Sequence, residues 1–143
     1  YDPSYRRGSS KDQKQDKNQH IRLTREDAEN YLKACESNPN LSINEFAKGL
    51  MESKGIKEAP GAKIVADFSV YINSNQENAL YAGITTDLSG LDFSNRDLRG
   101  ACFVGTNLQD CKFNNAKLDQ ATLEGADASR ADFSGVSAKD TNL

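Results

Sequence analysis

The sequence predicts an α+β protein in which a small helical N-terminal region precedes a β-helical solenoid with four-sided coils. Three observations predict it. A five-residue repeat runs through residues 86–143, apolar residues recur at helical spacing between residues 21 and 85, and helix-capping sequences precede the first two helical stretches. The chain has 143 residues, enough for roughly one domain of ordinary size.

Residues 1–20 are polar, lack an apolar period and carry mild positive charge that acidic residues dilute. Such a segment buries too little apolar surface to offset its ordering entropy, so it is predicted to be a flexible tail. The chain does not begin with Met, and we expect it to be a fragment or a processed product.

Residues 21–60 are predicted to form a helical hairpin. Thr24 and Asp27 give the first helix a capping start, Pro39 breaks it, and Ser42 with Glu45 forms a capping box for the second helix. The apolar stripes are too short to stabilise the two helices alone. We therefore expect the helices to pack on each other and to present their other faces to a partner. The candidate interaction residues are Tyr31, Leu32, Phe46, Leu50 and Met51.

Residues 61–85 are predicted to form a helical cap on the solenoid. The apolar residues between Ile64 and Ile72 follow a three–four spacing, which favours a helix, while the alternation after Phe68 leaves a strand as the alternative. The first coil of a solenoid needs such a cover. We expect Phe68, Ile72 or Leu80 to cover Phe93 and its neighbours.

Residues 86–143 comprise eleven full pentads and three residues of a twelfth. The third position of every pentad is apolar, the first is mostly small, and the others are mainly polar. The large third-position residues are predicted to form the solenoid core, namely Leu88, Phe93, Leu98, Phe103, Leu108, Phe113, Leu118, Leu123, Phe133 and Leu143.

A five-residue period fits neither an α-helix nor a β-strand. The chain must instead turn a quarter circle every five residues, so that four turns close a coil of 20 residues. Stacked coils, about 4.8 Å apart, would place Phe93, Phe113 and Phe133 in one column. Leu91 and Arg96 stand where other pentads have small residues, which predicts that the first coil is the covered end.

These pentads resemble the pentapeptide-repeat family, whose pattern is Ala-(Asp/Asn)-Leu-x-x. The pentads that begin at Ala116, Ala121, Ala126 and Ala131 carry the resemblance best. It implies a right-handed quadrilateral β-helix. It also implies a binding or scaffold role, because some members are bacterial effectors delivered into host cells and others are accessory domains of larger signalling proteins. We expect a non-enzymatic protein–protein interaction module with a protein partner of unknown identity.

Two other functions follow from the same resemblance. The first is a DNA mimic that acts on DNA gyrase. Fewer than three coils give a rod of about 13 Å, less than half a DNA turn, and Lys112 interrupts the acidic column of Asp92 and Asp132. Both features argue against mimicry. The second is an accessory domain of a larger enzyme, on which this sequence is silent.

Composition argues against catalysis and against several ligands. The 18 Lys and Arg residues against 21 Asp and Glu residues leave a net charge of −3, whereas a nucleic-acid binder normally carries a basic excess. No apolar run approaches the roughly 18 residues of a membrane span. A Cys–His pair would require His20, the single histidine, while Cys111 is predicted to point into the coil and Cys102 outward. We expect no catalytic residue, no cofactor and no metal.

The three cysteines, Cys35, Cys102 and Cys111, show no disulfide framework and predict reduced thiols in the cytoplasm, or in the host cytoplasm if the protein is a secreted effector. The last pentad stops at Leu143 without a cap. We therefore expect the β-helix to be incomplete at its C-terminus. Either further coils follow in a longer protein, or the fragment associates end to end.

Overall fold

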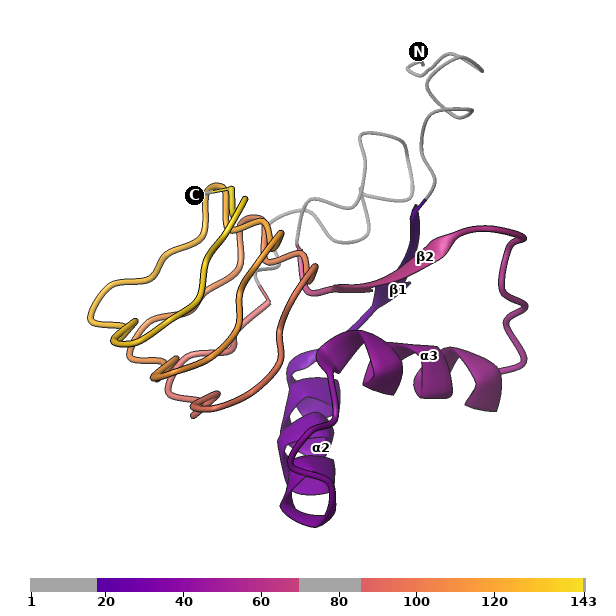
Figure 1. The fold of residues 1–143 in the computed structure, drawn as a ribbon, viewed down its shortest axis with the longest axis horizontal. Helices are drawn as coiled ribbons and strands as arrows, with labels where there is room; N and C mark the ends of the chain where they lie inside the picture. Colours follow the sequence, from indigo (N-terminus) through magenta and orange to yellow (C-terminus); the bar gives the residue numbers. More distant parts are fainter. Residues whose placement is uncertain (1–17, 70–85, 143) are drawn as a thin grey trace.

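The computed structural model describes residues 18–69 and 86–142. Strand β1 (Asn18–Arg22) is followed by helices α2 (Arg25–Ser37) and α3 (Ile43–Ser53), by strand β2 (Lys63–Asp67), and then by the stacked coils of residues 86–142. Figure 1 shows the coils side by side at one end of the molecule, with the two helices and the strand pair at the other. The predictions for residues 1–17, Ile72, Leu80 and Leu143 lie outside the described residues.

Both predicted capping sequences form. The Thr24 side chain accepts the backbone N–H of Asp27, and the Asp27 carboxylate accepts the backbone N–H of Thr24. Ser42 and Glu45 make the same reciprocal pair at the start of α3. The two helices therefore begin where unpaired N–H groups find side-chain acceptors.

The helices cross instead of lying side by side, although both fall within residues 21–60 as predicted. Helix α2 runs away from the strand pair and α3 runs beneath it (Figure 1). They meet where the Tyr31 and Phe46 rings pack edge to face, with centroids 5.6 Å apart. The buried residues of α3 (Ile43, Ala47 and Met51) belong to the main hydrophobic core. Each helix is thus stabilised by the rest of the protein more than by the other helix.

Two strands replace predicted non-strand segments. Residues 18–20, predicted to end a flexible tail, belong to β1, and residues 63–67, predicted to start a helix, form β2. The strands are parallel, with Asn18 opposite Lys63 and Arg22 opposite Asp67. β2 also pairs with the β-helix at Cys102, which satisfies backbone groups on both of its edges. A helix could not pair in this way, so tertiary pairing overrides the three–four spacing.

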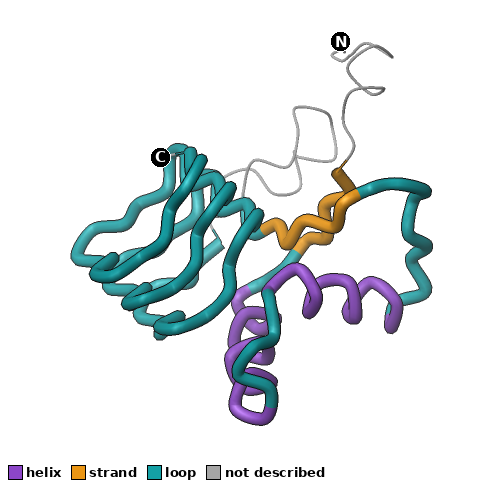
Figure 2. The backbone as a smooth tube through the Cα atoms, viewed as in Figure 1, coloured by secondary structure: helices purple, strands orange, loops and turns teal. Residues whose placement is uncertain are grey.

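The β-helix has the predicted period of 20 residues. Parallel bridges join positions 20 residues apart on each of four faces, beginning with Asp87 to Asn107, Asp92 to Lys112, Asp97 to Lys117, and Cys102 to Thr122. Figure 2 shows the coils stacked without long regular strands, because each face is only a few residues wide. We number the faces 1 to 4 in this order.

The fifth residue of every described full pentad turns the corner. All eleven, from Gly90 to Asp140, have φ between 57° and 77°, in the left-handed region. Six of these residues are not glycine, and four of the six are Asn or Asp, which tolerate this conformation better than other side chains. The quarter turn inferred from the period therefore has a local backbone cause at position five.

The core consists of stacked central residues, as predicted. The Phe113 ring stacks on Phe93 with centroids 5.5 Å apart and on Phe133 with centroids 4.9 Å apart. The central residues from Leu88 to Leu123 are buried. Phe133, in the third and last described coil, keeps 36% of its surface exposed because no further coil covers it among the described residues.

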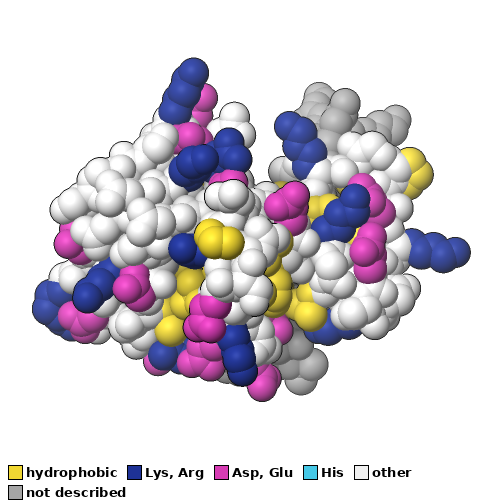
Figure 3. Space-filling view, turned by 60° about the horizontal axis from the view of Figure 1, so that its bottom comes forward, with side chains coloured by type: hydrophobic (Ala, Val, Ile, Leu, Met, Phe, Trp, Pro, Cys, Tyr) yellow, Lys and Arg dark blue, Asp and Glu magenta, His cyan; other side chains and the backbone are white. Residues whose placement is uncertain are grey.

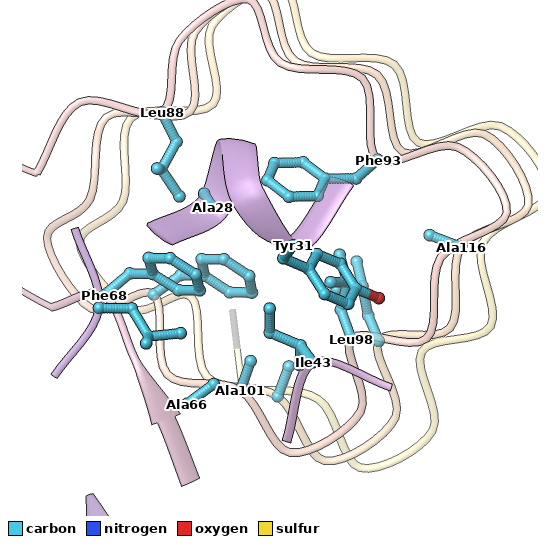
Figure 4. Packing of buried hydrophobic residues seen from close by; sticks show 14 of the residues in the cluster. Ala28, Tyr31, Ile43, Ala66, Phe68, Leu88, Phe93, Leu98, Ala101 and Ala116 are labelled. Carbon is cyan, nitrogen blue, oxygen red and sulfur yellow. The ribbon is translucent and has the colours of Figure 1, made fainter. Parts of the chain in front are cut away.

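Residues 66–68 cover the first coil, as predicted for residues 61–85, but as a rung and not as a helix, and residues 42–43 and helix α2 complete the cover. Segments 42–43 and 66–68 add rungs to faces 3 and 4: the N–H of Ile43 donates to Asp97 O (2.9 Å), and the N–H of Phe68 donates to Cys102 O (2.8 Å). Helix α2 lies across the remaining opening, with Ala28 and Tyr31 pointing toward the core (Figure 4). Phe68 covers the first coil, as predicted, but its ring stacks on Phe103 at 5.3 Å and not on Phe93.

Residues 66–69 are in fact a detached repeat. Their sequence, Ala-Asp-Phe-Ser, is identical to that of residues 131–134. In both segments the Ser N–H donates to the Asp Oδ1 two residues before it, at 2.9 Å. The cap is therefore built partly from the same five-residue unit as the coils, which the helical interpretation of this segment missed.

Candidate functional site

The histidine and the outward-facing thiol lie in one cluster on face 4. Because β1 and β2 extend this face, Arg22, Asp67 and Cys102 follow one another across it. His20 Nδ1 lies 2.8 Å from Asp67 Oδ2, so the imidazole donates to the carboxylate. His20, which was predicted to lie in a flexible tail, is thus held at a partly buried site. The pairing of β1 with β2 creates this site.

The electrostatics of this cluster do not activate a nucleophile. Burial raises the pKa of the Cys102 thiol, and the Asp67 carboxylate beside it raises that pKa further. For Asp67 the largest influence, burial, raises the pKa, but hydrogen bonds from His20 and Ser69 outweigh it and hold the pKa below its ordinary value. An ionised carboxylate next to a thiol disfavours the thiolate, which is the reactive form.

The other two cysteines are buried. Cys111 points into the coil, as predicted, and its thiol donates to Leu88 O at 3.0 Å. Burial raises the pKa of Cys111 to about 11. Cys35 lies on the core side of α2. The described residues contain no group of three or more His, Cys, Asp and Glu side chains that could hold a metal ion.

The candidate interaction residues on the helices divide into two groups. Tyr31 and Met51 are fully buried, so these two are core residues and are not available to a partner. The Tyr31 hydroxyl donates to Leu41 O at 2.9 Å, and burial raises the pKa of this phenol. Leu32, Phe46 and Leu50 are half-buried and pack against the core with part of each side chain exposed.

A groove of about 440 Å³ separates α2 from face 2 of the first coil. Leu32, Cys35 and Glu36 form its helix wall; Asp92, Ser94, Asn95 and Arg96 form its β-helix wall. Figure 3 shows apolar side chains gathered along the junction between the coils and the helical region, with charged side chains around them. We call this site the α2–face 2 groove.

The hydrogen bonds of Arg96 account for a long side chain at the first position of a pentad, where most pentads have a small residue. Its guanidinium leaves the coil and donates to Ser94 O (3.1 Å) and to Pro39 O in the loop between the helices (3.3 Å). Arg25 fixes the other end of α2, donating to Asp87 O and Ser89 O at 3.0 Å each. Two arginines therefore set the distance between the walls of the α2–face 2 groove.

A second groove, of about 260 Å³, lies between the strand pair and the corner of faces 3 and 4. Asn44 spans it: its Oδ1 accepts the Ala66 N–H and its Nδ2 donates to Arg99 O. The Arg99 guanidinium makes a bidentate pair with Asp97, at 2.8 and 2.6 Å. These polar groups hold the cap to the β-helix, so this groove is a joint between the two parts.

The outer surface of the β-helix carries charges of both signs. Along face 2 the outward column is Asp92, Lys112 and Asp132, with the lysine between two acids as the period predicted. At the corner after face 1, Arg130 pairs with Asp110 at 2.8 Å. No stripe of acids alone runs along these columns. In the described part of the chain no helix is long and apolar enough to cross a membrane.

A comparison with protein-family models agrees with the repeat pattern. A family model described as pentapeptide repeats matches residues 86–115 and 106–143, in eight copies. One solved structure, a pentapeptide repeat protein (Rfr23) from the cyanobacterium Cyanothece 51142, is 24% identical over 61% of this chain and 67% of that chain, with a TM-score of 0.27. The curated proteins gave no match. Residues 86–143 thus carry the repeats that the pentapeptide-repeat family model describes.

Proposed function

We propose that this chain is a non-enzymatic protein–protein interaction module, acting as a scaffold by itself or within a larger effector or signalling protein. The observation that carries the proposal is the α2–face 2 groove. It combines a partly apolar floor with exposed charged rims, and it lies between two parts that Arg25 and Arg96 hold in fixed positions. Rigid, preformed surfaces of this kind suit protein recognition, because little ordering entropy is lost on binding.

The chemistry of the cysteines and the histidine supports a role other than catalysis. The pKa values of Cys102 and Cys111 are both raised, and the His20 imidazole donates to Asp67. Nucleophilic catalysis by a thiol requires the opposite, a lowered thiol pKa and a base within reach. Scaffolding requires only surface shape and charge.

The DNA-mimic alternative has less support. A mimic of duplex DNA should present an unbroken acidic stripe. Face 2 instead presents Asp92, Lys112 and Asp132 in sequence, and Arg130 neutralises Asp110 at a neighbouring corner. A supercoiling assay with purified DNA gyrase tests this alternative, and protection of gyrase by the chain would favour it over the interaction module.

The proposed function is tested by chemical crosslinking in cells that produce the protein, followed by reconstitution with the purified crosslinked protein. We expect a complex of defined stoichiometry in light scattering, formed equally well by the wild-type chain and by Cys102→Ser. Failure to find any protein that reconstitutes such a complex would contradict the proposal, as would substrate turnover that Cys102→Ser or His20→Asn abolishes.

A further inference from the structure

We propose that the α2–face 2 groove binds an extended segment of a partner protein in which one apolar side chain is flanked by Lys or Arg. This inference rests on the proposed function and names the chemistry of its partner. Three features of the groove support it: the apolar floor, the two carboxylates on the rims, and the hydrogen bonds made by the arginine that lines it.

The floor accepts an apolar side chain. Leu32 is half-buried and packs against the core with one side while the other side lines the groove, and Cys35 lies one turn further along α2. Burying apolar surface against such a floor stabilises a complex by roughly 25 cal/mol per Å². The groove is open along its length and has room for a few side chains, which fits an extended segment better than an enclosed small molecule.

The rims are acidic on both sides. Glu36 lies on the helix wall and Asp92 on the β-helix wall, and both are exposed. Hydrogen bonds from Ser94 hold the pKa of Asp92 below its ordinary value, so this carboxylate is ionised at neutral pH. A segment that places an apolar residue on Leu32 would bring its flanking residues toward these two carboxylates, where cations are favoured.

The cations near the groove bind backbone carbonyls or lie beside Asp92, where Arg96 and Lys112 help to hold the pKa of its carboxyl low. The Arg96 guanidinium donates to the carbonyl oxygens of Ser94 and Pro39. Arg25 binds Glu29 and the carbonyls of face 1 at the far end of α2. Lys112 stands one coil beyond Asp92. An acidic segment would therefore be repelled by the exposed carboxylates of Glu36 and Asp92.

The test uses an array of randomised nonapeptides probed with the full chain, followed by fluorescence anisotropy on selected peptides. Glu36→Gln with Asp92→Asn removes both rim charges, and asparagine still accepts the Ser94 N–H. The matched control is Glu124→Gln with Asp127→Asn, since Asp127 accepts the Ser129 N–H in the same way outside the groove. Leu32→Ser tests the floor, with Ile56→Ser, an exposed residue elsewhere, as its control.

We expect selected peptides to carry an apolar residue flanked by Lys or Arg. The Glu36→Gln/Asp92→Asn pair should weaken their binding about tenfold, and Leu32→Ser by a similar factor, while neither control changes it. Selection of acidic or uncharged peptides, selection of none, or equal loss with the controls would overturn the inference. A reconstituted partner whose binding ignores the groove variants would overturn it too, yet leave the proposed function intact.

Discussion

Phe113→Ala is the sharpest test of the coil register. The Phe113 side chain is fully buried and lies between two parallel rings, at 5.5 Å from Phe93 and 4.9 Å from Phe133. Truncating a buried phenylalanine to alanine costs about 3–5 kcal/mol, because the lost transfer energy and the cavity add. The loss of two stacked contacts favours the upper part of that range. For a protein of this size the melting temperature should fall by roughly 10–20 °C.

The assay is urea unfolding followed by circular dichroism, since the chain contains no Trp to report by fluorescence. Phe133→Ala is the matched control, because Phe133 has one stacking partner and is 36% exposed. It should cost only about 1–2 kcal/mol. Phe113→Leu should cost no more than about 1.5 kcal/mol, as leucine already follows phenylalanine in the column of Phe103 and Leu123.

The three variants are compared by how much each lowers the free energy of unfolding. If Phe113→Ala destabilises the protein no more than Phe133→Ala does, then Phe113 does not lie between two rings and the four-column register is wrong. A small cost for all three variants would show that the stacked rings contribute little beyond occupying volume.

Three further predictions concern other parts of the chain. A peptide of residues 21–58 should be largely unstructured by circular dichroism, because its buried residues pack on the β-helix and on β2; strong helicity at room temperature would refute this. Acid should destabilise the protein, because Ser hydrogen bonds lower the pKa values of Asp87, Asp92 and Asp127, and that of Asp132 to about 2. The stabilisation from these ionised aspartates is fully present above the ordinary aspartate pKa of 3.8 and is lost as the pH falls toward 2. A urea unfolding midpoint that does not move between pH 5 and pH 2 would count against this prediction. Because Phe133 stays exposed, the 143-residue chain should self-associate weakly in light scattering, and Phe133→Lys with Leu143→Glu should abolish this; a strict monomer at millimolar concentration would contradict the expectation.

The cap shows how local sequence and tertiary pairing compete. Residues Lys63–Asp67 and Phe68 have spacing that a helix could use, yet they form a strand and a rung, because Cys102 and β1 offer backbone partners on both edges. The repeated Ala-Asp-Phe-Ser at residues 66–69 and 131–134 is a signal that could have found this rung. It was missed because it stands outside the continuous repeat.

The α2–face 2 groove could not be predicted from the sequence, for a different reason. Leu32 was identified as a candidate from the helical stripe, and Arg96 as a departure from the repeat. Nothing in their spacing places Glu36 of α2 opposite Asp92 of the first coil. Their proximity depends on how α2 crosses the opening, which Arg25 and Arg96 fix through long-range hydrogen bonds to backbone carbonyls.

The sequence by itself determined the β-helical repeat, its period of 20 residues, the phenylalanine column and both helix caps. Each of these depends on interactions within one turn or on an exact repeat, and such patterns are visible along the chain. Only the tertiary structure decided that His20 and Asp67 meet, that two segments far apart in sequence complete the cap, and that α2 and face 2 enclose a groove. Those features depend on pairing between backbone edges that are distant in sequence. Local sequence patterns do not indicate the free energy of that pairing.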